Sequence, residues 1–108
     1  MTETEIPKPD VYKAIADPTR RQIMDLLLTD HPLTIQAITN KFDASRQATS
    51  KHIYVLEQAG LIRIEDKGRE RYCFPHFIPL KEVTHWLAFY KTYWEDRISD
   101  LENYLDSQ

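Results

Sequence analysis

The sequence predicts a mainly helical domain with a small β-hairpin and a long C-terminal helix, and three observations support this. Apolar residues recur at helical spacing in four segments between residues 10 and 59. Two short alternating segments flank Gly68, which is typical of a hairpin. A helical pattern then runs from about residue 79 to 105. The 108 residues suffice for one domain, so we expect a mobile arm at residues 1–9 and a single domain at 10–108.

Capping residues define the first three predicted helices. Asp10 precedes a short helix over residues 11–16, because a carboxylate accepts hydrogen bonds from the first exposed backbone N–H groups. A second helix over residues 18–29 begins with proline, which suits the first turn of a helix. Thr34 caps a third, short helix over residues 34–41.

The fourth helix and the hairpin are also bounded by clear signals. Ser45 caps the fourth helix, which ends at Gly60, where helices often finish with a left-handed residue. Residues 61–65 alternate between apolar and polar and predict a strand. A second strand is expected at 69–74, with the turn between them at 66–68.

Composition excludes several classes of protein. Apolar residues make up 42% and charged residues 29%, as in ordinary globular proteins. No apolar run approaches the roughly 20 residues of a membrane span, and the N-terminus lacks a signal-peptide pattern. The single Cys73 cannot form an internal disulfide. We therefore expect a cytoplasmic protein.

No catalytic set emerges from the sequence, so we do not expect an enzyme. Asp43, Ser45 and His52 are close in sequence, but capping and packing explain them. Two glycines are too few for a phosphate-binding glycine loop, and nothing predicts a cofactor.

Charge is distributed unevenly along the chain. The net charge is −3, but residues 1–10 carry −2, residues 11–74 carry +2 and residues 75–108 carry −3. An acidic protein still binds nucleic acid when its basic groups cluster on one face. We therefore expect any such contact to be a local patch in the middle of the chain.

The fourth helix has two distinct faces at 100° per residue. One arc is apolar apart from Thr49 and His52, and we interpret His52 as a packed structural histidine. The opposite arc is polar, as on any surface helix. Its side chains are also those that read base edges and bind phosphates at the start of a DNA-recognition helix. The candidate DNA-binding residues are Ser45, Arg46, Gln47, Ser50, Lys51 and Tyr54.

The predicted hairpin adds a second basic element. Lys67, Arg69 and Arg71 surround its glycine turn, where cations follow a phosphate backbone or enter a minor groove. Asp66 and Glu70 partly cancel this positive charge. The alternative to a DNA contact is a solvated hairpin with a charged tip. A helix-turn-helix pattern followed at once by a basic hairpin is more specific than either part.

These residues resemble the ArsR/SmtB family of repressors. The resemblance implies a winged helix-turn-helix homodimer that represses transcription, in which the fourth helix and the hairpin, or wing, contact operator DNA. The chain departs from the family at Arg46-Gln47, where Gln-Pro is common. Residues 85–105 further resemble the non-metal, SdpR-like branch. The segments that carry the family resemblance are 14–21, 45–53, 55–62 and 67–72.

A metal site is not expected. Founding members of the family sense metals through cysteines in the third helix, and residues 35–41 contain neither Cys nor His. A second family site lies on the last helix, where Glu82, His85 and Asp96 form only a loose set, short of the four ligands of zinc. We interpret Cys73 as a small buried apolar residue.

The last helix predicts a dimer. About 27 residues form a helix roughly 40 Å long, which a core of this size cannot cover. Its apolar residues follow a heptad-like spacing, here called the seam. A two-fold dimer predicts a palindromic operator with half-sites one DNA turn apart. The seam consists of Leu80, Val83, Leu87, Tyr90, Trp94, Ile98, Leu101 and Leu105, and the predicted interface is Tyr12, Ile15, Leu87, Tyr90, Trp94, Ile98 and Leu101.

Three functions remain open from the sequence. The preferred one is a metal-independent repressor with a DNA-binding core at about 18–75 and dimerisation helices at about 10–16 and 79–105. The second is a repressor that depends on a metal at Glu82, His85 and Asp96. The third is a winged-helix module that binds protein, which the net charge of −3 favours and the basic residues disfavour. The operator and any effector stay unidentified.

Overall fold

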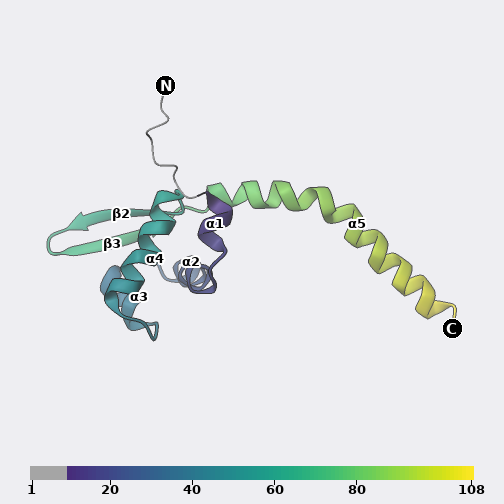
Figure 1. Cartoon of the computed structure of the whole chain (residues 1–108), viewed down its shortest axis with the longest axis horizontal. Helices are drawn as coiled ribbons and strands as arrows, with labels where there is room; N and C mark the ends of the chain where they lie inside the picture. The colour runs from purple at the N-terminus through teal and green to yellow at the C-terminus, as the bar shows by residue number, and fades with distance from the viewer. Residues whose placement is uncertain (1–9) are drawn as a thin grey trace, which may run out of the picture.

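The computed structural model describes residues 10–108, so the predicted arm at residues 1–9 lies outside the described residues. Helices and a small sheet form a body from which the last helix extends (Figure 1). In chain order the elements are α1 (Val11–Ile15), α2 (Pro18–Thr29), β1 (Leu33–Thr34), α3 (Ile35–Asn40), α4 (Arg46–Gln58), β2 (Ile62–Lys67), β3 (Glu70–Pro75), the 3-10 turn η1 (Ile78–Leu80) and α5 (Lys81–Asp106).

The predicted helix caps are confirmed. Asp10, Thr34 and Ser45 each accept a hydrogen bond from the backbone N–H three residues ahead, at 2.7, 3.0 and 3.0 Å. Asp17 caps α2 in the same way, at 3.1 Å from the Arg20 nitrogen. Each cap satisfies an N–H group that the helix cannot pair, which fixes where each helix starts.

Gly60 ends α4 as predicted, with a φ of 81°. The start of α5 differs from the prediction by two residues. Pro79 belongs to η1, and the α-helix begins at Lys81. A single 3-10 turn therefore joins the sheet to the long helix.

The sheet has three antiparallel strands in the order β1-β3-β2. The sequence prediction missed β1, in which Leu33 pairs with Cys73. It also placed the hairpin turn wrongly at 66–68. Lys67 still pairs with Glu70, so Gly68 and Arg69 form the turn, and Gly68 supplies the required positive φ of 63°.

The core lies where α2, α3 and α4 meet the sheet. Ile23, Leu27, Ile38 and Leu56 are completely buried, and Cys73 joins them from β3. Val11 and Ala14 of α1 belong to this cluster, and Val83 at the start of α5 packs against it. Its buried members are Val11, Ala14, Ile23, Met24, Leu27, Ile35, Ile38, Ile53, Leu56, Leu61, Ile62 and Cys73.

Helix α5 is largely uncovered. It leaves the body at α1 and projects away from the hairpin (Figure 1). Its start is held by Tyr12, whose hydroxyl donates to the Glu82 carbonyl at 3.0 Å and whose ring meets Trp86 edge to face at 6.0 Å. No side chain of α5 is buried, and Trp94 and Leu101 are 61% and 58% exposed. In the part of the chain described here, no helix is long and apolar enough to cross a membrane.

Candidate nucleic-acid interface

The polar face of α4 is open to solvent at its first two turns. Arg46, Gln47 and Lys51 are exposed, Tyr54 is 58% exposed, and Ser50 is half-buried. Thr49, Ile53 and Leu56 on the opposite face are buried. The wheel prediction of two faces is therefore confirmed. The exposed N-terminal end also presents unpaired N–H groups, which favour anions.

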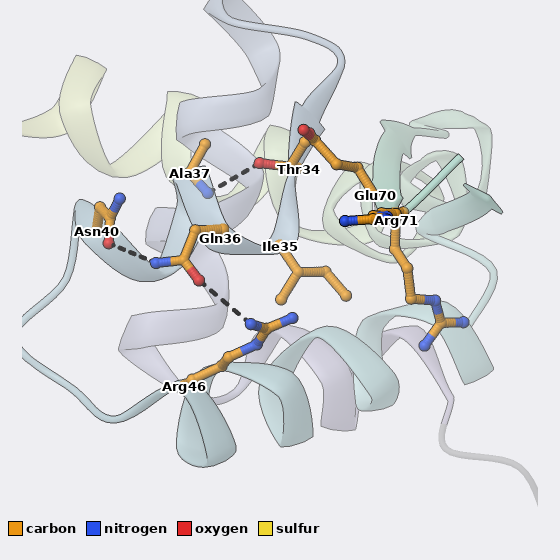
Figure 2. Close-up of a pocket in the computed structure, with 9 residues that line it drawn as sticks. Thr34, Ile35, Gln36, Ala37, Asn40, Arg46, Glu70 and Arg71 are labelled. Atoms are coloured by element: carbon orange, nitrogen blue, oxygen red, sulfur yellow. Dashed lines mark hydrogen bonds between the residues drawn. The ribbon is translucent and has the colours of Figure 1, made fainter. Parts of the chain in front are cut away.

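A groove of about 530 Å³ lies beside Arg46, between α3, α4 and β3 (Figure 2). A hydrogen-bonded chain runs along it. The Arg46 guanidinium donates to Gln36 Oε1 at 3.3 Å, and Gln36 Nε2 donates to Asn40 Oδ1 at 3.0 Å. Thr34 caps α3 at the same edge. Sequence reasoning missed Gln36 and Asn40. The signal that could have found them is that both are polar and lie one helical turn apart on α3, the helix before α4.

The structure divides the three predicted wing cations between different surroundings. Arg69 and Arg71 line the same groove as Arg46, together with Glu70. Lys67 does not line this groove, and its ammonium lies over the ring of Tyr72 at 5.8 Å. Arg71 pairs with Asp66, the neighbour of Lys67, so Lys67 and Arg71 point to opposite faces of the hairpin.

Two of these cations are already engaged within the hairpin. Arg71 Nε donates to Asp66 Oδ1 at 3.0 Å, in an exposed ion pair. Lys67 also lies 5.6 Å from the Phe74 ring centre. Within residues 10–108 the Arg69 side chain, in the turn itself, has no hydrogen-bond or ion-pair partner. It is therefore the wing cation most available to a ligand.

Arg20 of α2 fixes α4 relative to α1. Its guanidinium donates to the Ala14 carbonyl at 2.6 Å and to the Lys13 carbonyl at 3.0 Å. Its third nitrogen lies 3.3 Å from Nδ1 of His52 on α4. His52 is half-buried at this junction, which fits the packed histidine expected from the wheel.

Asp17 completes this junction. The backbone N–H of Arg20 holds the pKa of its carboxyl below the usual value, and the nearby His52 and Arg20 side chains act in the same direction. His52 Nδ1 lies 3.9 Å from Asp17 Oδ2. The junction therefore ties the cap of α2 to the middle of the helix that carries the candidate site.

The residues considered for a metal do not come together in one chain. Among the described residues no group of three or more His, Cys, Asp or Glu side chains is positioned to hold a metal ion. Asp96 follows His85 by eleven residues on the same helix, which is about 16 Å along its axis. Cys73 is completely buried, and burial raises its pKa to about 11, so its thiol stays protonated.

The predicted interface residues are mostly uncovered. Tyr12 is 36% exposed and Tyr90 is 44% exposed, while Ile15 is half-buried against the core. The remaining predicted interface residues, Leu87, Trp94, Ile98 and Leu101, are more than half exposed.

Comparison with known proteins identifies the family. A helix-turn-helix domain family matches residues 15–65. The Bacillus subtilis protein YuzN, an uncharacterized HTH-type transcriptional regulator, is 45% identical over 70% of this chain and 89% of its own length. The transcriptional repressor SdpR of the same organism is 36% identical over 72% of this chain and 86% of its own.

A solved structure extends this agreement to the fold. The crystal structure of an ArsR family transcriptional regulator is 37% identical to this chain. It superposes with a TM-score of 0.69, over 78% of this chain and 86% of the other. These relatives are named as regulators of transcription, not as enzymes. The chain belongs to the ArsR/SmtB-type family of winged helix-turn-helix transcriptional regulators.

Proposed function

We propose that this protein is a metal-independent repressor, acting in the cytoplasm, that binds a palindromic operator as a homodimer. The observation that carries the proposal is the polar face at the start of α4, which is open to solvent. Its first two turns present Arg46, Gln47 and Lys51 without covering structure in the described chain. Similarity to SdpR, which is named a repressor, supports repression rather than activation.

In this proposal α4 reads bases in the major groove. Arg46 and Gln47 have the bidentate geometry that matches guanine and adenine edges. Lys51 and Tyr54 follow one and two turns later, where the helix passes the phosphate backbone. Ser45 and Ser50 supply hydroxyls for phosphates at the edge of the same surface.

The groove beside α4 suits one strand of the DNA backbone. Arg46, Arg69 and Arg71 line it, and a phosphate is the ligand that several arginines bind best. Arg69 enters the adjacent minor groove from the turn, and Lys67 supports the wing from its other face. Binding must displace the Arg46 contact with Gln36, which is exposed and weak at 3.3 Å.

The dimer part of the proposal rests on α5 and α1. A folded protein rarely leaves a row of aromatic and aliphatic side chains exposed along a whole helix. Two copies that share Tyr12, Ile15 and the α5 seam would present two α4 helices to DNA. A two-fold axis then requires two half-sites of opposite orientation.

A fluorescence anisotropy titration with DNA from the protein's own promoter tests the proposal, at two salt concentrations and with or without chelator. We expect tight binding that resists competitor DNA, weakens with salt and ignores chelator. Arg46→Ala should weaken binding about tenfold or more, because a bidentate base contact contributes about 1–3 kcal/mol. Lys51→Ala should weaken binding and reduce the salt slope by about one.

Lys13→Ala provides the matched control, because it removes one positive charge from the exposed face of α1. Its affinity should stay within twofold of the parent. If Lys13→Ala and Arg46→Ala lost DNA affinity equally, the loss would come from general charge. Helix α4 would then be rejected as the helix that reads the bases. Chelator-sensitive binding, or stoichiometric zinc in purified protein, would favour the metal-dependent alternative.

A protein-binding module is the remaining alternative, and the net charge of −3 is its support. Selection from random DNA sequences separates it from a repressor with a distant operator. If the protein had a dimeric mass and still enriched no DNA sequence, DNA binding would be rejected.

A further inference from the structure

Arg46 is turned toward α3 in the unbound protein (Figure 2). It is the first residue of α4, directly after the Ser45 cap, and it is exposed. Its guanidinium donates to Gln36 Oε1 of α3 at 3.3 Å. In the part of the chain that the structure covers, this is its one hydrogen bond. The Gln36 oxygen therefore sets the direction of a side chain that is otherwise free to turn.

Asn40 fixes which end of the Gln36 amide faces Arg46. Gln36 Nε2 donates to Asn40 Oδ1 at 3.0 Å, one helical turn along α3. This leaves the carbonyl oxygen of Gln36, which is an acceptor, toward α4. The reversed amide would place its NH2 group against a guanidinium, which has only N–H donors. The three side chains therefore form one chain of hydrogen bonds with a fixed direction.

The position that Gln36 gives to Arg46 lies in the groove beside α4. Arg69 and Arg71 line the same groove, and Glu70 is the single carboxylate among its described lining residues. Like charges that share a groove repel each other. The Gln36 oxygen therefore holds a third cation in a place that charge alone does not favour.

Base reading requires the Arg46 guanidinium to point in another direction. To read guanine, it must present two N–H donors to N7 and O6 of one base. Gln36 offers one acceptor atom and guanine offers two, so an operator guanine displaces Gln36. The free energy of the Arg46–Gln36 contact then reduces the free energy of operator binding. DNA without a guanine in register offers no such pair of acceptors, so there the contact with Gln36 persists.

We propose that Gln36, oriented by Asn40, is a positioning residue that holds Arg46 against α3 and thereby lowers affinity for the operator. The contact is exposed, and exposed contacts of a charged group contribute little, so the effect on the operator dissociation constant is about two- to fivefold. Affinity for DNA of unrelated sequence is unaffected. This inference rests on the proposed function, in which α4 reads bases, and adds a residue outside α4 that sets the strength of operator binding.

Anisotropy titrations with two duplexes test the proposal. The first duplex is one that the parent protein enriches from random DNA, here called the operator duplex, and the second has the same composition in scrambled order. Gln36→Leu removes the acceptor at an exposed position. We expect its dissociation constant to fall about two- to fivefold for the operator duplex and to change less than about 1.5-fold for the scrambled one. An unchanged constant for the operator duplex would overturn the proposal.

Gln22→Leu is the matched control. It makes the same replacement at an exposed position of α2 that does not line the groove. Both dissociation constants should stay within about 1.5-fold of the parent values, because no contact of Arg46 is changed. An equal gain in Gln22→Leu and Gln36→Leu would show a general effect of an added apolar side chain and overturn the proposal.

Arg46→Ala shows whether Gln36 acts through Arg46. When Arg46 is already alanine, Gln36→Leu should leave the operator dissociation constant unchanged, since the contact between the two residues no longer exists. Weaker binding of Gln36→Leu with either residue at position 46 would mean that Gln36 contacts DNA itself. Weaker binding only when Arg46 is present would mean that Gln36 supports base reading. Either result would overturn the proposal.

Nuclear magnetic resonance of the unbound protein supplies a measurement that does not involve DNA. The Nε–H signal of Arg46, assigned by its loss in Arg46→Ala, should report more motion on the ps–ns timescale in Gln36→Leu than in the parent. Asn40→Ala should act in the same direction, because it frees the Gln36 amide to turn. Equal mobility in all three proteins would overturn the proposal.

Failure of the proposed function gives a different result. If the parent protein enriches no duplex from random DNA, base reading by α4 is rejected and this inference falls with it. If the parent binds an operator duplex tightly and Gln36→Leu binds it equally well, the inference alone is rejected.

Discussion

Removal of the Arg20 side chain should loosen the attachment of α1 to the body. Arg20 donates to the carbonyls of Ala14 and Lys13, at the end of a helix that is only five residues long. Such a short helix is not stable alone, because nucleation costs more than its few hydrogen bonds return. Arg20→Ala leaves α1 with its Asp10 cap, its two buried side chains and the Tyr12 contact with α5. Exposed hydrogen bonds from Arg21 to the Ile15 and Ala16 carbonyls also remain.

The size of the loss follows from the two contacts. A hydrogen bond from a charged group contributes about 1.5–3 kcal/mol, and the half-buried bond to Ala14 belongs in that range. The exposed bond to Lys13 contributes less because water replaces it. Together they predict about 2 kcal/mol of unfolding free energy, which corresponds to a fall in Tm of about 10 °C for a domain of this size.

Urea denaturation at one fixed chain concentration measures this loss, since dimerisation makes stability depend on concentration. Arg46→Ala is the control, because it removes an arginine whose one hydrogen bond is exposed and long. Arg20→Lys should recover less than half of the loss, since an ammonium does not reproduce the guanidinium fork. An Arg20→Ala variant as stable as Arg46→Ala would refute the anchoring role.

Three further predictions concern the junctions of the fold. The pKa of Asp17 lies below its usual 3.8, so its ionised form stabilises the protein above that pH and this contribution is lost as the pH falls through the folded-state pKa. Asp17→Asn keeps a capping oxygen, and its stability should fall less steeply with acid in denaturation series down to about pH 2. Cys73 should react with a thiol reagent near pH 8 only after unfolding in urea; fast reaction of the native protein would contradict its burial. Gly60→Ala should destabilise the protein by about 1–2 kcal/mol on urea denaturation, because alanine disfavours a φ of 81°. The added Cβ itself meets only Pro79, at 3.8 Å, so any much larger loss would contradict a purely conformational cause.

Local signals explain why most helices were predictable. Caps such as Thr34 and Ser45 act within three residues of their own position, so the sequence contains the whole interaction. The two faces of α4 likewise follow from a single helical period. Strand β1 was not predictable in this way, because two residues carry no period and Leu33 pairs with a residue forty positions later.

The candidate site was predictable in its list of cations but not in their arrangement. Residue type and spacing located Arg46 on α4 and Arg69 on the hairpin. The tie between Arg46 and Gln36 joins two helices and has no local signature. The contact of Lys67 with aromatic rings depends on which face of the strand it occupies, and the hairpin register decides that.

The uncovered seam of α5 has a consequence for gene dosage. If operator binding needs two chains, then well below the dimer dissociation constant the concentration of active repressor rises with the square of the chain concentration. A twofold fall in synthesis then removes about three quarters of the active species. Unpaired chains meanwhile present their aromatic side chains to proteases and to one another. The strength of pairing along one helix would thus set a threshold in the amount of protein, below which the target genes are transcribed.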